Sequence, residues 1–311
     1  MTSVADLDTP AVTVDLDIMR DNIRRVQAHL ARHGIGNRPH IKTHKIPAIG
    51  RMQMEAGAVG ITCQKLGEVE VFVDAGVADD VLLTYNILGQ PKTDRLMALV
   101  KRVRRLAVVL DNDVVARELS EAAVHAGVDV RFLVECDTGF GRTGVQTPDE
   151  AFDLARGVAR FPRMHFEGLM TFPNRDPNTR DFFERALALF KQAGIAVPVV
   201  SGGGTPALFT AQNFPMLTEH RAGTCVYNDA MVVDRHRHLG QLRHARAGHG
   251  GEPADAHARD HRRRLQGADV GSLLHEGLRT CDGVSGGRRD GPLGRARHRR
   301  SLRLRRAPEG R

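Results

Sequence analysis

The sequence predicts an α/β protein, a (β/α)8 TIM-like barrel over most of its length. Two observations predict this class. Residues 1–234 repeat one rhythm, in which a short apolar run rich in β-branched residues is followed by a stretch with helical periodicity. About eight such units fit this length, and strands that alternate with helices form parallel sheets. A closed barrel is therefore preferred, and an open doubly wound sheet is the alternative.

The expected strands are the apolar runs of this rhythm. In chain order they are residues 11–16, 39–42, 59–62, 81–85, 106–110, 130–135, 166–170, 198–202 and 223–227. Helical patterns lie between them. One follows the first strand and ends at Gly34, a residue type favoured just after a helix C-terminus. Another starts after Thr147, whose side chain can cap a helix, and Pro148 suits its first turn.

The rhythm stops after residue 234. The 311-residue chain has a formal net charge of +8, yet residues 235–311 alone hold 19 arginines against 8 acidic residues, so the rest is slightly acidic. This segment has no Lys, Ile, Phe, Tyr, Met or Asn, and it lacks the large apolar side chains that offset the entropy of folding. We therefore predict a barrel domain over residues 8–234. Residues 235–311 are predicted to be a low-complexity basic tail that is disordered or out of frame.

Other global features argue against several classes of protein. We expect no membrane anchor, because no apolar run is long enough to span a bilayer and the first residues carry no signal-peptide pattern. The four cysteines lie far apart without a CxxC pair, which favours reduced thiols in the cytoplasm over a disulfide framework or a zinc site. A nucleic-acid partner is not favoured, because basic arms that bind nucleic acid usually contain lysine and interleaved aromatic residues.

The candidate site is the C-terminal end of the strands, where the loops of a parallel barrel meet. In the stretch NRPHIKTHK we expect Lys42 to be the last residue of its strand. His44 and Lys45 would add positive charge that keeps its amine unprotonated and nucleophilic. Two glycine-rich turns, SGGGTP and RAGTC, can offer backbone N–H groups to a phosphate. A nucleophilic lysine that faces a phosphate cradle indicates pyridoxal 5'-phosphate (PLP) as the cofactor.

A second motif, GFGRTG at residues 139–144, formally matches GxGxxG and follows a predicted strand. That combination would indicate a dinucleotide site. However, the next helical pattern begins only at Thr147, past the last glycine of the motif. We therefore rank a nicotinamide cofactor below PLP.

Several motifs together resemble one known family. RPHIKTHK, TCQKLGE, DTGFGRTGV, FEGLMTFP, SGGGTPA and EHRAGTCVYND occur in an order and spacing similar to those of the D-threonine aldolase / D-serine dehydratase family. These are alanine-racemase-like, fold-type III PLP enzymes with a (β/α)8 barrel and a C-terminal β-domain. The resemblance implies that Lys42 binds the cofactor covalently, that Arg142 contacts its phenolic oxygen and that Gln64 lies near its ring. It also implies that residues of the two glycine turns hold the phosphate, namely Gly203, Gly204, Thr205, Gly223 and Thr224.

The chain departs from the family pattern at several positions. Phe172 stands where the family commonly has a tyrosine whose hydroxyl can meet the pyridine nitrogen, and Arg221 is the alternative candidate for that role. Cys225 replaces a usual aromatic residue. The resemblance ends at Asp234, where a shifted reading frame could restore family-like residues. We therefore hypothesise a frameshift there, and stop codons in the shifted frame of the nucleotide sequence would refute it.

The resemblance also implies features that this chain does not supply. In the family the C-terminal domain completes the site, often across a homodimer, and brings the ligands of a divalent metal such as manganese. We find no such ligand set here and predict no metal-binding residue. The predicted function is a cytoplasmic PLP-dependent aldehyde-lyase that cleaves D-threonine and other D-3-hydroxy amino acids to glycine and an aldehyde, with impaired activity. The alternatives are a D-serine dehydratase or amino-acid racemase, and a non-catalytic PLP-binding barrel protein.

Overall fold

The computed structural model describes residues 13–174, 177–228 and 246–247. These residues belong to one compact unit, Met1–Ala254. Most of the predicted tail, and with it the frameshift hypothesis, lies outside the described residues. No helix among the described residues is long and apolar enough to cross a membrane.

The described residues form a sheet of eight strands in which every neighbouring pair is parallel. The order around the sheet is β2-β9-β8-β7-β6-β5-β4-β3, so from β3 to β9 consecutive strands are neighbours. The strands are β2 (Gly36–Asn37), β3 (Ile61–Cys63), β4 (Asp80–Leu83), β5 (Arg105–Leu110), β6 (Val130–Cys136), β7 (Met164–Thr171), β8 (Val199–Gly202) and β9 (Glu219–His220).

The sheet closes on itself between β2 and β3. The backbone N–H of Val59 donates to the carbonyl of Asn37 at 2.9 Å, and that of Thr62 donates to Pro39 at 2.9 Å. A parallel bridge between His40 and Thr62 extends the same pairing. The prediction of a barrel is therefore confirmed, and the open doubly wound sheet is excluded.

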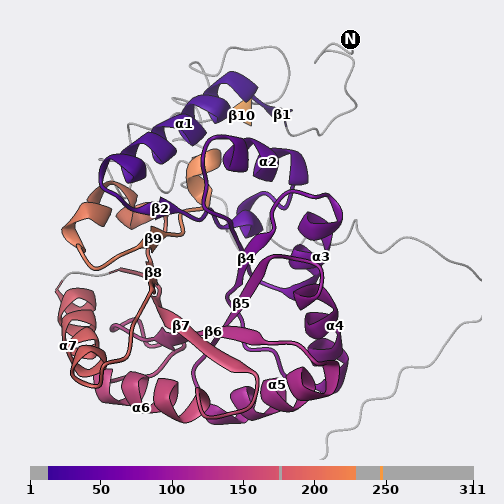
Figure 1. Ribbon diagram of the computed structural model, residues 1–311. Coiled ribbons are helices and arrows are strands. Elements are labelled where there is room, and N and C mark those ends of the chain that lie inside the picture. Colours follow the sequence, from indigo (N-terminus) through magenta and orange to yellow (C-terminus); the bar gives the residue numbers. More distant parts are fainter. Residues whose placement is uncertain (1–12, 175–176, 229–245, 248–311) are drawn as a thin grey trace, which may run out of the picture. The chain divides into compact units, whose positions relative to one another are not determined.

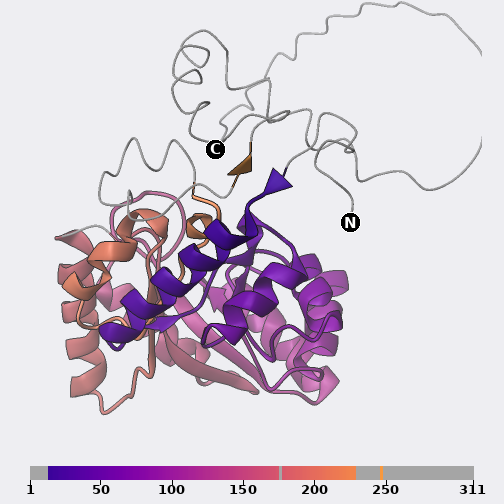
Figure 2. The same cartoon turned by 90° about the horizontal axis from the view of Figure 1, so that it is seen from above.

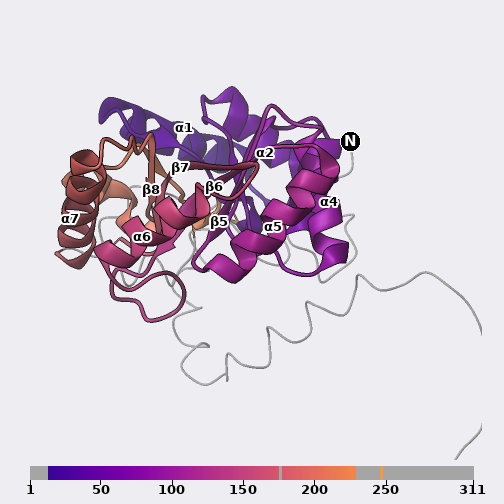
Figure 3. The same cartoon turned by 60° about the horizontal axis from the view of Figure 1, so that its bottom comes forward.

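Helices surround the strands, as Figures 1 and 3 show. Helix α1 packs against β2 and the turns η3 and η4, which Figure 2 shows from above. The predicted helix signals near Gly34 and Thr147 are confirmed, since α1 ends just before Gly34 and Thr147 caps α6 in a capping box with Glu150. The helices are α1 (Leu16–Arg32), α2 (Pro47–Glu55), α3 (Leu66–Asp74), α4 (Gln90–Val100), α5 (Asp113–Ala126), α6 (Pro148–Val158) and α7 (Asn178–Gln192). Three 3-10 segments, η2 (Ile41–Thr43), η3 (Thr205–Asn213) and η4 (Thr224–Val226), lie in the loops.

Three predicted strands are wrong or displaced. The first, 11–16, is not in the barrel, because β1 (Thr13–Val14) pairs antiparallel with β10 (Arg246–Ala247). The second predicted strand, 39–42, lies too far along the chain, because the observed strand β2 ends at Asn37 and the η2 turn follows it. The last, 223–227, is displaced in the same direction, because β9 ends at His220 and η4 follows it. Both barrel strands are short and carry polar residues, so neither resembles an apolar run.

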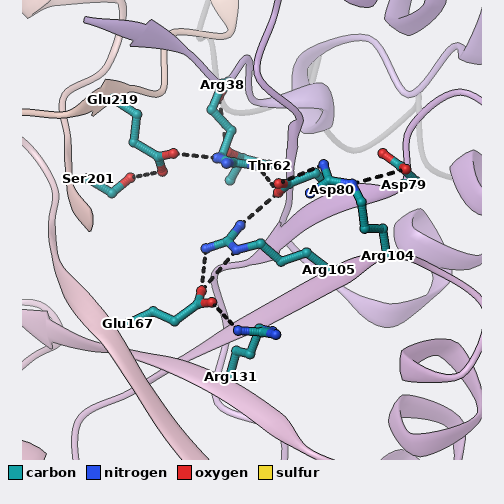
Figure 4. A network of polar contacts seen from close by, with 10 residues as sticks. All are labelled: Arg38, Thr62, Asp79, Asp80, Arg104, Arg105, Arg131, Glu167, Ser201 and Glu219. Carbon is teal, nitrogen blue, oxygen red and sulfur yellow. Dashed lines mark hydrogen bonds and ion pairs between the residues drawn. The ribbon is translucent and has the colours of Figure 1, made fainter. Parts of the chain in front are cut away.

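The barrel interior is filled in layers. An apolar layer in the middle consists of Leu82, Ala107, Val109, Leu133 and Met170. The alternate residues of the same strands, such as Val81 and Val108, face the helices and join the main core. At the N-terminal ends of the strands a network of ion pairs joins Arg38, Asp80, Arg104, Arg105, Arg131, Glu167 and Glu219 (Figure 4). The opposite end, where the strands terminate, is left for the site.

Candidate active site

Lys42 lies at the C-terminal end of the barrel, on the η2 turn rather than at a strand end. Its backbone N–H donates to Nδ1 of His40, the residue that caps this turn, at 3.5 Å. Its amine donates to Oε1 of Gln64 at 3.3 Å. The turn therefore aims the lysine at the loop that follows β3.

The environment of this amine favours its neutral form. Partial burial, followed by the positive charge of Arg142, lowers the pKa of Lys42 below its ordinary value of 10.5. The negative charge of Glu68 raises the pKa of Lys42, and the positive charge of Arg221 lowers it further. The amine is thus more nucleophilic than an isolated surface lysine at the same pH.

The prediction that His44 and Lys45 supply this positive charge is wrong. His44 is buried, its Nε2 lies 3.2 Å from Oε1 of Gln53, and its Nδ1 accepts the N–H of Ile46. Burial lowers the pKa of His44 to about 4, so its ring is neutral. Lys45 instead pairs with Glu68 at 3.6 Å.

Gln64 is held in place by its own contacts. Its side-chain amide donates to the carbonyl of Thr84 at 2.9 Å, and its backbone N–H donates to the buried carboxylate of Glu68 at 2.7 Å. These contacts leave Oε1 directed at Lys42. The structure thus brings together two predicted residues that are 22 positions apart.

Arg142 stands on the loop after β6, beside Lys42. Its guanidinium lies over the ring of Phe172, with its carbon 5.1 Å from the ring centroid, and 5.6 Å from that of Phe140. Among the described residues it has no carboxylate or carbonyl partner. Its donors are therefore available to an anionic oxygen at the barrel mouth.

The two glycine turns meet next to the η2 turn. A Cβ on Gly204 would lie 2.7 Å from Phe172, and one on Gly223 would lie 2.6 Å from Oγ1 of Thr43. Thr205 links the turns, because its hydroxyl accepts the N–H of Cys225 at 3.3 Å. In these two turns, the backbone N–H groups of Gly204, Thr205, Gly223 and Thr224 have no acceptor among the described residues.

Gly203 differs from the other glycine-turn residues. Its N–H already donates to Oδ1 of Asn174 at 2.7 Å. It has a φ of +82°, and a Cβ here would lie 1.9 Å from the ring of His220. Gly203 therefore shapes the turn by its conformation and small size rather than by a free donor.

A buried arginine lies under the site. Arg221 donates from Nη1 to the hydroxyl of Ser201 at 2.6 Å and from Nη2 to the carbonyl of Thr171 at 2.7 Å. Burial lowers the pKa of Arg221 to about 10, so it stays cationic at neutral pH. Ser201 in turn donates to Glu219 at 2.6 Å, a contact drawn in Figure 4.

Sequence reasoning did not select Ser201, Glu219, His40 or Asn174 as site residues. Each lies on a short strand or turn whose direction becomes known only when the barrel closes. Within the described residues there is no group of three or more His, Cys, Asp or Glu side chains that could share a metal ion.

The chain matches the alanine racemase N-terminal domain over residues 14–230. It belongs to this family. It is 33% identical over 239 residues to a D-threonine aldolase of Arthrobacter sp. and 32% identical over 240 residues to a 3-hydroxy-D-aspartate aldolase of Paracoccus denitrificans. Each match covers 73% of this chain and 62% of the relative, so the chain spans about three fifths of the length of these relatives.

A solved structure agrees with this assignment. The D-threonine aldolase of Filomicrobium marinum superimposes with a TM-score of 0.72 at 32% identity, covering 78% of this chain and 69% of that one. The resemblance that the sequence motifs indicated is thereby confirmed, together with its barrel fold. PLP is the cofactor expected of aldolases with this fold.

The described residues fit PLP. A phosphate needs donors and room, and the two glycine turns offer four free N–H groups where added Cβ atoms would collide with Phe172 and the Lys42 turn. An aldehyde reacts with the neutral form of an amine, and the lowered pKa of Lys42 favours that form. An anionic ring oxygen needs a cation, and Arg142 has no ion pair with any described residue that would compete for this role.

Proposed function

We propose that this chain is the PLP-binding barrel of an aldehyde-lyase that acts on D-3-hydroxy amino acids. The observation that carries the proposal is the position of one amine. The amine of Lys42, whose pKa is lowered, lies 3.3 Å from Oε1 of Gln64. Beside it, Arg142 has no ion-pair partner among the described residues, and four N–H groups of the two glycine turns have no acceptor there. The two relatives described above are named as aldolases of D-threonine and 3-hydroxy-D-aspartate.

Each residue has a part in this proposal. Lys42 attaches the cofactor aldehyde, Arg142 binds its phenolic oxygen, and Gln64 holds the lysine in place. The phosphate is held by Gly204, Thr205, Gly223 and Thr224, on a turn shaped by Gly203. Bound PLP supplies an electron sink that stabilises negative charge at Cα of an amino acid.

The ring nitrogen of the cofactor needs a partner that Phe172 cannot be, because its side chain has no donor or acceptor. Arg221 is our candidate for this partner, since it is a buried cation whose charge acts on Lys42.

Binding is tested first. Recombinant protein incubated with PLP should develop the visible absorbance of bound cofactor, and Lys42→Ala should lose it. Lys45→Ala is the matched control, because this exposed lysine on the same loop pairs with Glu68 instead. Equal cofactor binding by Lys42→Ala and wild type would refute the proposal.

The reaction type is tested by its products. We expect glycine and an aldehyde from D-threonine and from D-3-hydroxyaspartate, whereas a dehydratase would release a keto acid and a racemase would invert the amino acid. The family's divalent metal has no ligand set among the described residues. We therefore expect much lower turnover than that of the Arthrobacter enzyme assayed alongside, even with manganese. Equal turnover would show that the site is not impaired.

The cytoplasmic location and the homodimer are also proposals. The cysteines Cys63, Cys136 and Cys225 are buried free thiols, which suits a reducing compartment. A homodimer is proposed only for a form of the protein that has the family's C-terminal domain. Light scattering of the chain and of such a form would distinguish the two states.

A further inference from the structure

The loop after β6 matches a phosphate-binding pattern, but its N–H groups are directed at a side chain of this protein. Oδ1 of Asp137 accepts the N–H groups of Gly139 at 2.9 Å and Phe140 at 2.7 Å. Oδ2 accepts those of Gly141 at 2.7 Å and Arg142 at 3.2 Å. Four consecutive backbone donors thus surround one carboxylate.

Such a concave run of N–H groups is an anion site, and in nucleotide-binding loops it holds a phosphate. Here the anion is built in. Asp137 is only 4% exposed. Burial alone would raise the pKa of its carboxyl, but the N–H groups of Phe140, Gly139 and Gly141 outweigh burial, and the pKa is lowered. The carboxylate stays charged and occupies the place that a phosphate would take, so GFGRTG does not act as a dinucleotide loop.

The far end of the loop is held by two more carboxylates. Glu135 accepts the hydroxyl of Thr143 at 2.9 Å, and Asp111 accepts the N–H of Gly144 at 3.2 Å. Gly144 has a φ of +107°, and a Cβ there would lie 2.6 Å from the backbone nitrogen of Asp137. Both ends of the loop are therefore fixed against the end of β6.

The residue carried by this fixed loop is Arg142. Its backbone N–H is one of the four donors, while its guanidinium reaches over Phe172 toward Lys42. Without the carboxylate, the four N–H groups, which belong to exposed residues, would lose the acceptor that gathers them, and the loop would open toward water or take up an anion.

We infer that Asp137 is a positioning residue, an internal anion that fills the nest of residues 139–142 and holds Arg142 at the site. The part of this inference that concerns the cofactor rests on the proposed function, whereas the part that concerns the loop does not.

Hydrogen exchange tests the loop directly. In the full chain with Asp137→Ala, the amides of residues 139–142 should exchange at least about 10-fold faster than in wild type. Formate, which can occupy the vacated nest, should restore slow exchange, and chloride at the same ionic strength should not. The matched control is Asp153→Ala on α6, an exposed carboxylate with no ion pair among the described residues.

Cofactor affinity tests the link to Arg142. Asp137→Ala should bind PLP roughly 10- to 100-fold more weakly while still attaching it to Lys42, and formate should recover most of the loss. Asp153→Ala should bind as wild type does. A merely structural role would not give rescue by a small carboxylate.

The outcomes separate the two ideas. Unchanged exchange in Asp137→Ala, or faster exchange that formate does not slow, overturns the inference. Faster exchange rescued by formate in a protein that never binds PLP supports the role of Asp137 in the loop and refutes the proposed function.

If Asp137→Ala does not fold, Asp137→Asn replaces it. This variant turns an NH₂ group toward two donors, so at least two of the four amides should exchange faster, and no change overturns the inference.

Discussion

Gly223→Ala tests how closely the phosphate turn and the lysine turn approach each other. The backbone φ of Gly223 is −126°, so alanine is not excluded by conformation. The obstacle is space. The new Cβ would lie 2.6 Å from Oγ1 of Thr43 and 2.7 Å from the carbonyl oxygen of His40, both on the turn that carries Lys42.

The size of the effect follows from these contacts. Ordinary van der Waals contact begins near 3.4 Å, so the two turns must move apart by ~0.7–0.8 Å to make room for the new Cβ. Overpacking of this kind costs about 1–3 kcal/mol. The free protein can relax by moving the Lys42 turn outward. The bound state needs Lys42 and the N–H of Gly223 in place together, so the cost appears on binding and weakens PLP affinity on the order of 5- to 150-fold.

The assay is a PLP titration of wild type and variant, followed by absorbance, with urea unfolding to monitor stability. Gly157→Ala is the control, because nothing lies within 4 Å of its added Cβ on helix α6. This control should bind PLP normally and gain up to ~1 kcal/mol of stability. Wild-type affinity in Gly223→Ala would show that the two turns do not act as one site.

Three further predictions concern charge. His44 and His220 have pKa values lowered by burial to about 4, against 6.5 when exposed. As the pH falls, these two rings are therefore protonated in the unfolded chain before they are protonated in the folded one. The free energy of unfolding should be greatest above pH 6.5 and should decrease toward pH 5 by up to ~1.4 kcal/mol per pH unit for each ring. A urea midpoint that is flat over this range would contradict the prediction. In cofactor-free protein at pH 8, a reagent that reacts with amines, added below one equivalent, should modify Lys42 before the surface lysines. Arg142→Met should slow the modification of Lys42. Equal rates of Lys42 modification in wild type and Arg142→Met would refute the effect of Arg142. Arg38→Met should cost about 3–5 kcal/mol in the free energy of unfolding. It leaves the buried carboxylate of Glu219 without an ion-pair partner among the described residues and removes one of the three arginines that pair with Asp80 (Figure 4). A loss under ~1 kcal/mol in urea unfolding would contradict this prediction.

The sequence predicted the barrel well where strands are buried on both faces. β5 is apolar from Leu106 to Leu110, and most residues of β6 and β8 are also buried. The predicted ranges of these three strands fall within about a residue of the observed ones. β2 and β9 were missed. They are two-residue strands whose polar side chains, such as Asn37 and Glu219, point into hydrogen-bonded surroundings that no local pattern reveals.

Several residues of the candidate site could be predicted from the sequence, but its electrostatics could not. The motifs indicated Lys42 and the glycine turns, because those residue types have specific chemistry at loop ends. The electrostatics were attributed to the sequence neighbours His44 and Lys45, one of which is neutral and the other paired. The charge that acts most on Lys42 belongs to Arg142, 100 residues away, and only closure of the barrel brings the two together.

Reductive trapping tests the central claim most directly. The full chain is incubated with PLP at pH 8, reduced with borohydride and digested, and the modified peptides are identified by mass spectrometry. We predict one dominant pyridoxyl adduct, on Lys42, which free inorganic phosphate diminishes by competing for the turns at Gly204 and Gly223. An adduct spread over the surface lysines, or one on Lys42 that phosphate leaves unchanged, would contradict a site built from that amine and those two turns.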